Sequence, residues 1–242
     1  QVITPEMLPL IALTQAEIDG IVAGAPGGAA NIKDIYPLAP LQEGILFHYL
    51  MSAHGDAYLQ PCLLAFDTRQ LLDNFVGALS AVIARHDILR TAVVWEGLPE
   101  PAQVVWREAP LAIEEVAMDS SVDVASRLRA SFDPRIIRLD VRRAPLMRCV
   151  IAHDAANDRW LMLWLSHHLA GDHTTQKIMA LEAQAFLQGE SERLPAPLPF
   201  RNFVAQARLG VSREEHEAFF REMMNDFDEP IAPFGLLDAQ GD

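Results

Sequence analysis

Cysteine is scarce in this sequence, which argues against a fold held together by disulfides. Cys62 and Cys149 are the only thiols among 242 residues, and their spacing matches no paired motif. Small secreted domains that depend on disulfides are much richer in cysteine. We therefore expect a protein of the reducing cytoplasm, in which each cysteine is a small core side chain.

Basic residues are also few, and long apolar runs are absent. The 19 Lys and Arg residues face 33 Asp and Glu residues, which gives a formal charge of -14 at pH 7. Nucleic-acid phosphates and anionic membrane surfaces repel such a chain. No apolar run approaches the ~20 residues that span a bilayer, and the first residues lack the pattern of a secretory signal. We expect no nucleic-acid partner and no membrane partner.

The sequence does contain enough apolar side chains for a sizeable core. Half of the residues are hydrophobic, which excludes wholesale disorder. A chain of 242 residues can form one large domain or two small ones, and it contains no internal repeat. It begins with Gln1 and not with methionine, from which we expect a part of a longer protein.

A doubled histidine is the stretch that most suggests chemistry. His167 and His168 follow an apolar run of strand-like length, residues 160–165, and precede a helical pattern that begins near Thr174. Successive side chains of an extended segment point to opposite faces, so one imidazole can face a cleft while the other faces the core. A histidine in such a place can move protons near neutral pH.

Two other interpretations of these residues remain open. The histidines can be structural groups satisfied by backbone hydrogen bonds, with Asp172 as a helix N-cap. A metal site is the second alternative, because His167, His168, Asp172 and His173 are all possible ligands. The sequence favours it less, because it has neither the helical i, i+4 histidine pair of a zinc protease nor a thiolate cluster.

Strand and helix patterns are mixed along the chain. Residues 59–66 have the composition of a strand, and apolar residues at helical spacing follow in residues 71–83. Residues 91–95 and 102–106 predict one hairpin, and a second hairpin runs through His153 and back toward Trp160. The fold class is therefore α/β or α+β, with a mixed β-sheet packed against helices.

Four stretches resemble motifs of the condensation domains of nonribosomal peptide synthetases. Residues 166–172 are similar to the family signature of two histidines, three variable residues and an aspartate, although His173 stands where the family usually has glycine. Residues 35–48 resemble the first motif, residues 85–91 the second and residues 200–204 the fourth.

A further stretch, residues 48–56, resembles a motif of the dual epimerisation/condensation subfamily. That motif has two histidines, a leucine or isoleucine, four variable residues and Gly-Asp; here Tyr49 replaces the second histidine. The resemblance implies an epimerisation site or tunnel residue at His48. A phenol with a pKa near ~10 is a poor base at neutral pH, so Tyr49 is not expected to replace the missing imidazole.

The resemblance implies a fold with two chloramphenicol-acetyltransferase-like lobes arranged in a V, with a catalytic tunnel between them. Because only the first four motifs are present, the chain is expected to be the N-terminal lobe. Residues 1–34 would be a linker with a short helix from an upstream carrier domain, and residues 35–193 the lobe itself. Residues 194–242 would be a proline-rich linker and helices leading toward the missing C-terminal lobe.

The same resemblance implies amide-bond formation between carrier-bound donor and acceptor groups, with His168 beside the attacking amine. His167 and Asp172 would hold the loop, and we predict that Asp172 is buried beside an arginine, with Arg85, Arg90 and Arg148 as candidates. No bound cofactor and no metal are implied, because phosphopantetheine is supplied by the carrier proteins. The implied partners are upstream and downstream peptidyl carrier domains, the C-terminal lobe and an adjacent adenylation domain.

Two other function classes stay open at this point. A coenzyme A-dependent acetyltransferase-like enzyme would share the histidine motif, but it would not need the connector or the extended first motif. The second class is a non-catalytic module that docks carrier proteins. It stays open because half of the expected cleft would lie outside this chain.

Overall fold

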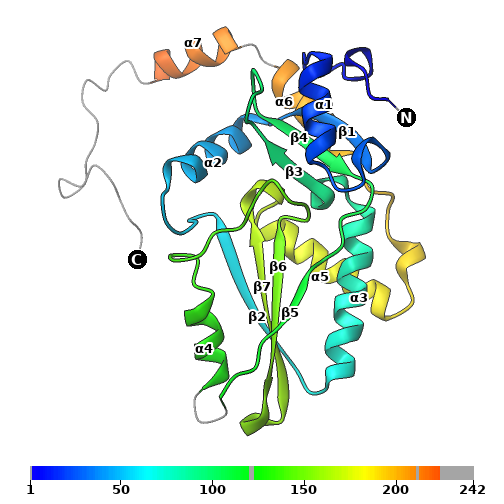
Figure 1. Ribbon diagram of the computed structural model, residues 1–242, viewed down its shortest axis with the longest axis vertical. Coiled ribbons are helices and arrows are strands. Elements are labelled where there is room, and N and C mark those ends of the chain that lie inside the picture. Colours follow the sequence, from blue (N-terminus) through cyan, green and yellow to red (C-terminus); the bar gives the residue numbers. More distant parts are fainter. Residues whose placement is uncertain (1, 120–122, 211–212, 224–242) are drawn as a thin grey trace, which may run out of the picture.

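The computed structural model describes residues 2–119, 123–210 and 213–223. Within these residues the chain forms two sheets and seven α-helices, shown in Figure 1. The strands are β1 (Ile32–Pro37), β2 (Leu59–Phe66), β3 (Thr91–Val94), β4 (Ala102–Trp106), β5 (Ile113–Glu115), β6 (Met147–Asp154) and β7 (Arg159–His167). The helices are α1 (Gln15–Gly24), α2 (Pro40–Met51), α3 (Arg69–Arg85), α4 (Val124–Ser131), α5 (His173–Leu187), α6 (Phe200–Leu209) and α7 (Arg213–Met223).

The larger sheet has the strand order β2-β7-β6-β5 and is mixed. Strands β2, β7 and β6 are antiparallel neighbours, whereas β5 runs parallel to β6. Every residue of β7 from Leu161 to His167 is buried, because helices cover both faces of this strand. α3 and α5 pack on the side of Met162 and Trp164, and α4 packs on the side of Leu163 and Leu165. β7 therefore forms the rigid centre of the sheet.

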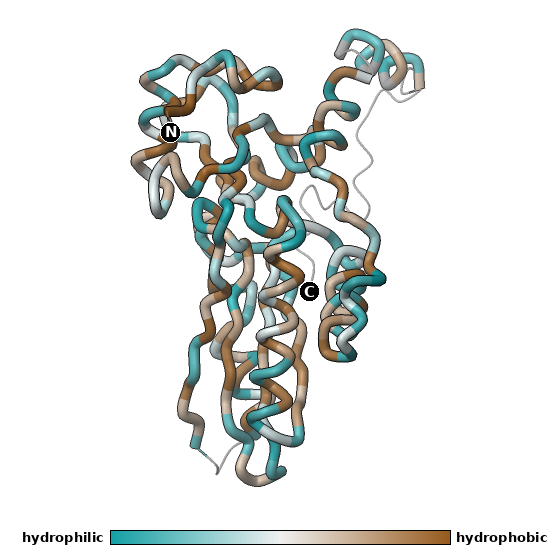
Figure 2. Tube along the Cα trace, turned by 90° about the vertical axis from the view of Figure 1, so that its right-hand side faces the viewer, coloured by the Kyte–Doolittle hydropathy of each residue, from teal (hydrophilic) through white to brown (hydrophobic). Residues whose placement is uncertain are grey.

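The helices cover this sheet with one apolar face each. In α3 the buried residues recur at helical spacing, and Thr68 caps its first turn through a hydrogen bond from the Leu71 N–H. Figure 2 shows apolar and polar stretches alternating along the helices beside the strands. Among the described residues, no helix is both long and apolar enough to cross a bilayer.

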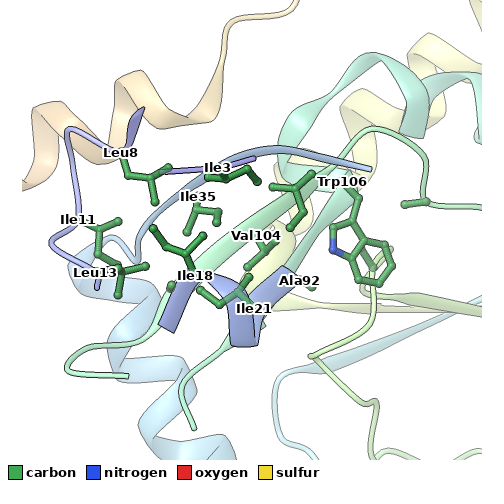
Figure 3. Close-up of a cluster of buried hydrophobic side chains, with 14 residues drawn as sticks. Ile3, Leu8, Ile11, Leu13, Ile18, Ile21, Ile35, Ala92, Val104 and Trp106 are labelled. Atoms are coloured by element: carbon green, nitrogen blue, oxygen red, sulfur yellow. The ribbon is translucent and has the colours of Figure 1, made fainter. Parts of the chain in front are cut away.

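The smaller sheet, β1-β4-β3, is covered by the N-terminal segment. Apolar side chains of residues 3–21 pack on the sheet around Val104 and Trp106, as Figure 3 shows; they are Ile3, Leu8, Ile11, Leu13, Ile18 and Ile21. α1 begins with the predicted capping box of Thr14 and Glu17. The segment is thus a packed layer of the fold.

The two hairpins and the strand at residues 59–66 are confirmed by the strand pairing. Cys149 is buried as expected, and burial raises the pKa of its thiol to about 12, whereas Cys62 is half-buried. No residue of the proline-rich stretch 195–199 lies in a helix or strand. Of the predicted C-terminal segment, residues 211–212 and 224–242 lie outside the described residues.

Candidate active site

The end of β7 places the doubled histidine between its neighbouring strands. His167 is the last residue of β7, and His168 begins a short 3-10 turn that leads to α5. The His167 N–H donates to the Leu146 carbonyl at 3.0 Å, and the His168 N–H donates to the Tyr58 carbonyl at 2.9 Å. Backbone hydrogen bonds on both sides of the strand therefore fix the positions of the two histidines.

The His167 side chain is fully buried and faces a buried carboxylate. Its Nδ1 accepts a hydrogen bond from the Leu169 N–H at 3.0 Å, so the proton of the neutral ring is on Nε2. Nε2 lies 3.0 Å from Oδ2 of Asp56, and both side chains are at most 1% exposed. Neither atom has a hydrogen-bond partner among the described residues, so the contact between them is electrostatic.

The residues around Asp56 hold its carboxylate in place. Its Oδ1 accepts from the Tyr58 N–H at 3.1 Å, and its own N–H donates to the Pro134 carbonyl at 2.7 Å. Gly55 has a φ of +67°, and a Cβ at this position would lie 2.5 Å from the Arg135 carbonyl oxygen. Glycine is therefore required by both the backbone conformation and the close approach of another chain segment.

Aromatic rings surround the two imidazoles. The Tyr49 ring meets the His167 ring edge-on at 5.8 Å, and the Tyr49 hydroxyl donates to the Leu139 carbonyl at 2.9 Å. The Tyr58 ring lies 6.1 Å from the His168 ring and 6.0 Å from the ring of His48, which is exposed on α2. Tyr49 thus packs against His167, whereas His48 lies on the same side of the site as Tyr58 and His168.

His168 is the more accessible imidazole of the pair. Desolvation lowers its pKa below the ordinary value of 6.5, and the neighbouring His167 lowers it further, while Asp172 and Asp56 oppose the shift. A lowered pKa keeps the ring neutral at pH 7. In that state one ring nitrogen can accept a proton.

The prediction that Asp172 is buried beside an arginine is wrong. Asp172 is exposed and caps α5: its Oδ1 accepts from the Thr175 N–H at 2.9 Å, and its own N–H donates to the Thr175 hydroxyl at 3.2 Å. The backbone hydrogen bond from Thr175 lowers the pKa of the carboxyl. The alternative role of Asp172 as a helix N-cap is confirmed: a short 3-10 turn leads from β7 to α5, and the carboxylate meets free N–H groups at the start of that helix.

The three candidate arginines each bind a different carboxylate. Arg85 donates to Glu182 of α5 at 3.1 Å, and so joins α3 to α5. Arg90 is buried and donates to Asp87 at 2.7 Å and to the Trp106 carbonyl. Arg148 pairs with Glu114, and both of these side chains are partly exposed. These arginines are structural, but none of them holds the histidine loop through Asp172.

The carboxylate beside His167 was not predicted from the sequence. Gly55 and Asp56 stood out only as the end of a subfamily motif, and their distance of more than a hundred residues from His167 hid the contact. The pairing of Leu59 with His167 between β2 and β7 brings the two together. In the part of the chain that the structure describes, no group of three His, Cys, Asp or Glu residues could hold a metal ion.

The fold is that of a condensation domain. The sequence matches the family model described as Condensation domain over residues 32–234, and the chain belongs to this family of nonribosomal peptide synthetases. It is 52% identical over 241 residues to malpinin synthetase of Mortierella alpina, covering 99% of this chain and 3% of that protein. It is 51% identical over 239 residues to malpibaldin synthetase of the same organism, covering 98% of this chain and 4% of that protein.

This chain covers about half of each of two solved structures with the same fold. A mutant of the starter condensation domain of rhizomide synthetase is similar with a TM-score of 0.63 at 15% identity, covering 82% of this chain and 50% of that one. The first condensation domain of the calcium-dependent antibiotic synthetase, in complex with a substrate analogue, is similar with a TM-score of 0.60 at 16% identity. The match covers 82% of this chain and 49% of that one. The mixed α/β, chloramphenicol-acetyltransferase-like fold class is confirmed.

Proposed function

We propose that this chain supplies the N-terminal lobe and the histidine motif of a domain that joins two carrier-bound aminoacyl groups. The acceptor amine attacks the carbonyl carbon of the donor thioester, a C–N bond forms and the C–S bond breaks. The amine proton ends on the departing phosphopantetheine thiol. Membership of the condensation-domain family supports this reaction class.

The observation that carries the proposal is the contrast between the two histidines. His167 is buried, whereas His168 is partly exposed at the end of the same rigid strand. Its pKa is lowered, so its neutral ring can take the proton that the amine loses as the C–N bond forms. In this proposal His168 is the proton acceptor, and His167 and Asp172 shape the loop that presents it.

The domain boundaries and partners are part of the same proposal. Residues 1–34 follow an upstream carrier domain and pack on the lobe that residues 35–193 form, and residues 194–242 lead to the C-terminal lobe. The chain covers about half of two solved condensation domains, which supports assigning the opposite wall of the tunnel to that second lobe. The phosphopantetheine arms of the two carrier domains deliver both substrates, and an adjacent adenylation domain loads the acceptor.

The test is a reconstitution with the full-length domain and two separately loaded carrier proteins. We expect the acceptor carrier to gain the mass of the donor aminoacyl group, measured on its phosphopantetheine arm. Acyl transfer from acetyl-coenzyme A, with none from the donor carrier, would instead identify an acetyltransferase-like enzyme. Carrier binding without any product would identify a docking module. Either result would contradict the proposal.

Epimerisation of the donor residue is a second candidate activity, and the position of His48 favours it. The Tyr58 ring lies 6.0 Å from the His48 ring and 6.1 Å from the His168 ring, so both imidazoles neighbour the same aromatic side chain. Tyr49 is packed against His167 with its hydroxyl hydrogen-bonded, so residue 49 does not act as the base. Any inversion of the donor α-carbon must then depend on His48.

Deuterium incorporation tests this second activity. An L-aminoacyl donor is presented to the full-length domain in deuterated water, and the α-carbon of the product is analysed for deuterium and configuration. A labelled D centre that is lost in His48→Ala supports the dual activity. An unlabelled L centre would reduce the function to condensation alone.

A further inference from the structure

The carboxylate of Asp56 is buried and ionisable, but the proposed function gives it no role. It lies against Nε2 of His167 at 3.0 Å, and both groups are shielded from solvent. A buried carboxylate without a cation is costly unless nearby donors stabilise it. The donors here are the Tyr58 N–H and, through its electrostatic contact, the Nε2–H of His167, so the carboxylate and the histidine depend on each other.

The short segment from Gly55 to Tyr58 touches both histidines. Asp56 contacts the ring of His167, the Tyr58 carbonyl accepts from the His168 N–H, and the Tyr58 ring lies edge-on to the His168 ring. The segment itself is anchored by the bond from Asp56 N–H to the Pro134 carbonyl. A change at Asp56 is therefore transmitted to His168 through two routes, the ring of His167 and the backbone of Tyr58.

We propose that Asp56 is a positioning residue for condensation, which fixes the Nε2–H tautomer and the orientation of His167 and thereby the placement of His168. The effect on turnover rests on the proposed function, in which His168 accepts the amine proton. The effect on the tautomer does not rest on it, because that follows from the contacts of His167 alone. The two parts can therefore be tested separately.

The chemistry requires a carboxylate here, and an amide of the same shape cannot replace it. Oδ1 of Asp56 accepts a hydrogen bond from the Tyr58 N–H, and Oδ2 lies in electrostatic contact with Nε2–H of His167. In Asp56→Asn, one of these donors would face the NH2 group. If His167 changed its tautomer to relieve this, its Nδ1–H would face the Leu169 N–H instead. Every arrangement of the variant leaves two donors opposed.

The charged groups near Asp56 and His167 determine how the Asp56→Asn variant should change the pH dependence of turnover. Asp56 and Asp172 raise the pKa of His168, while His167 lowers it. The guanidinium of Arg138 stacks on the Tyr49 ring at 4.1 Å and donates to the carbonyls of Tyr49 and Ser52. Removing the negative charge of Asp56 should therefore lower the pKa of His168 further and move the acid limb of the rate profile to lower pH.

The first measurement is nitrogen-15 NMR of the imidazoles in the 242-residue chain. We expect the wild-type His167 to carry its proton on Nε2, and we expect Asp56→Asn to lose that single tautomer. Asp73→Asn is the matched control, since Asp73 is exposed on α3 and pairs with Arg69. A wild-type His167 with its proton on Nδ1 would overturn the proposal without any variant.

The second measurement is condensation by the full-length domain. Displacement of a catalytic group by about 1 Å can cost about 10²-fold, so Asp56→Asn should lower kcat by about that factor, with KM little changed and the acid limb shifted down. Wild-type turnover in Asp56→Asn, alongside an inactive His168→Ala, would overturn the positioning role and leave the proposed function intact. Full turnover in His168→Ala would instead remove the proposed function and leave the tautomer result standing.

Discussion

The acid–base behaviour of His168 sets an expected pH profile for condensation. Desolvation and then His167 lower its pKa below 6.5, so the folded protein binds this proton less readily than an exposed imidazole does. The neutral, proton-accepting form therefore persists below pH 6.5. We expect kcat/KM of the full-length domain to be flat at neutral pH and to fall only as the pH drops through that lowered pKa. An acid limb centred above pH 6.5 would contradict the assignment.

Asp172 should contribute to stability as a helix cap and no more. Asp172→Ala removes the acceptor for the Thr175 N–H, and loss of such a cap costs about 0.5–2 kcal/mol. Because the pKa of Asp172 is lowered in the folded protein, the stabilisation by this cap is present at neutral pH. It is lost as the pH falls through the lowered pKa of Asp172. Denaturant unfolding of the variant measures it, with Asp73→Ala as a control expected to change stability by less than about 0.5 kcal/mol.

A loss of about 3–5 kcal/mol in Asp172→Ala would instead indicate a broken buried ion pair.

The site residues differ in how far their structural surroundings could be predicted from the sequence. The position of the doubled histidine at the end of a strand could be predicted, because the apolar run before it has the length of a strand. The partner of His167 could not, because it depends on which strand pairs with β7.

Among the elements, the N-terminal segment shows the largest difference between the arrangement predicted from the sequence and the arrangement in the structure. Its apolar residues have no strong period, since they alternate between short turns and α1, and a pattern search finds only one short helix there. Folding gathers them on one face of the smaller sheet. The hairpins and α3 were predictable because their patterns are local and regular.

The packed N-terminal layer leads to a prediction about Ile18. This side chain is fully buried between α1 and the smaller sheet, so Ile18→Ala should lower the free energy of unfolding by about 2–5 kcal/mol. Met7→Ala, at a side chain that is 49% exposed, is the control and should have little effect. Equal midpoints in denaturant for the wild type and Ile18→Ala would mean that the segment is a dispensable connector.

At the scale of the whole molecule, folding and catalysis have different requirements. The described residues contain clusters of buried side chains on both faces of β7, so the 242-residue chain should unfold cooperatively. We expect no amide formation by this chain alone, even with both loaded carriers present, because the proposal assigns the opposite wall of the tunnel to the C-terminal lobe. The measurement is product mass on the acceptor carrier, with the full-length domain as the positive control. Amide formation by residues 1–242 alone would contradict this division.

The central claim is that His168 carries out the proton transfer of condensation, and His168→Ala in the full-length domain tests it most directly. General acid–base groups contribute about 10²–10⁴-fold, so turnover between loaded carriers should fall by that factor while the thermal midpoint stays close to wild type. His153→Ala is the matched control, because His153 is exposed on β6 and stacks on Trp160. Loss of turnover in His168→Ala with full activity in His153→Ala is the predicted result. Near wild-type turnover in a folded His168→Ala domain would contradict the account.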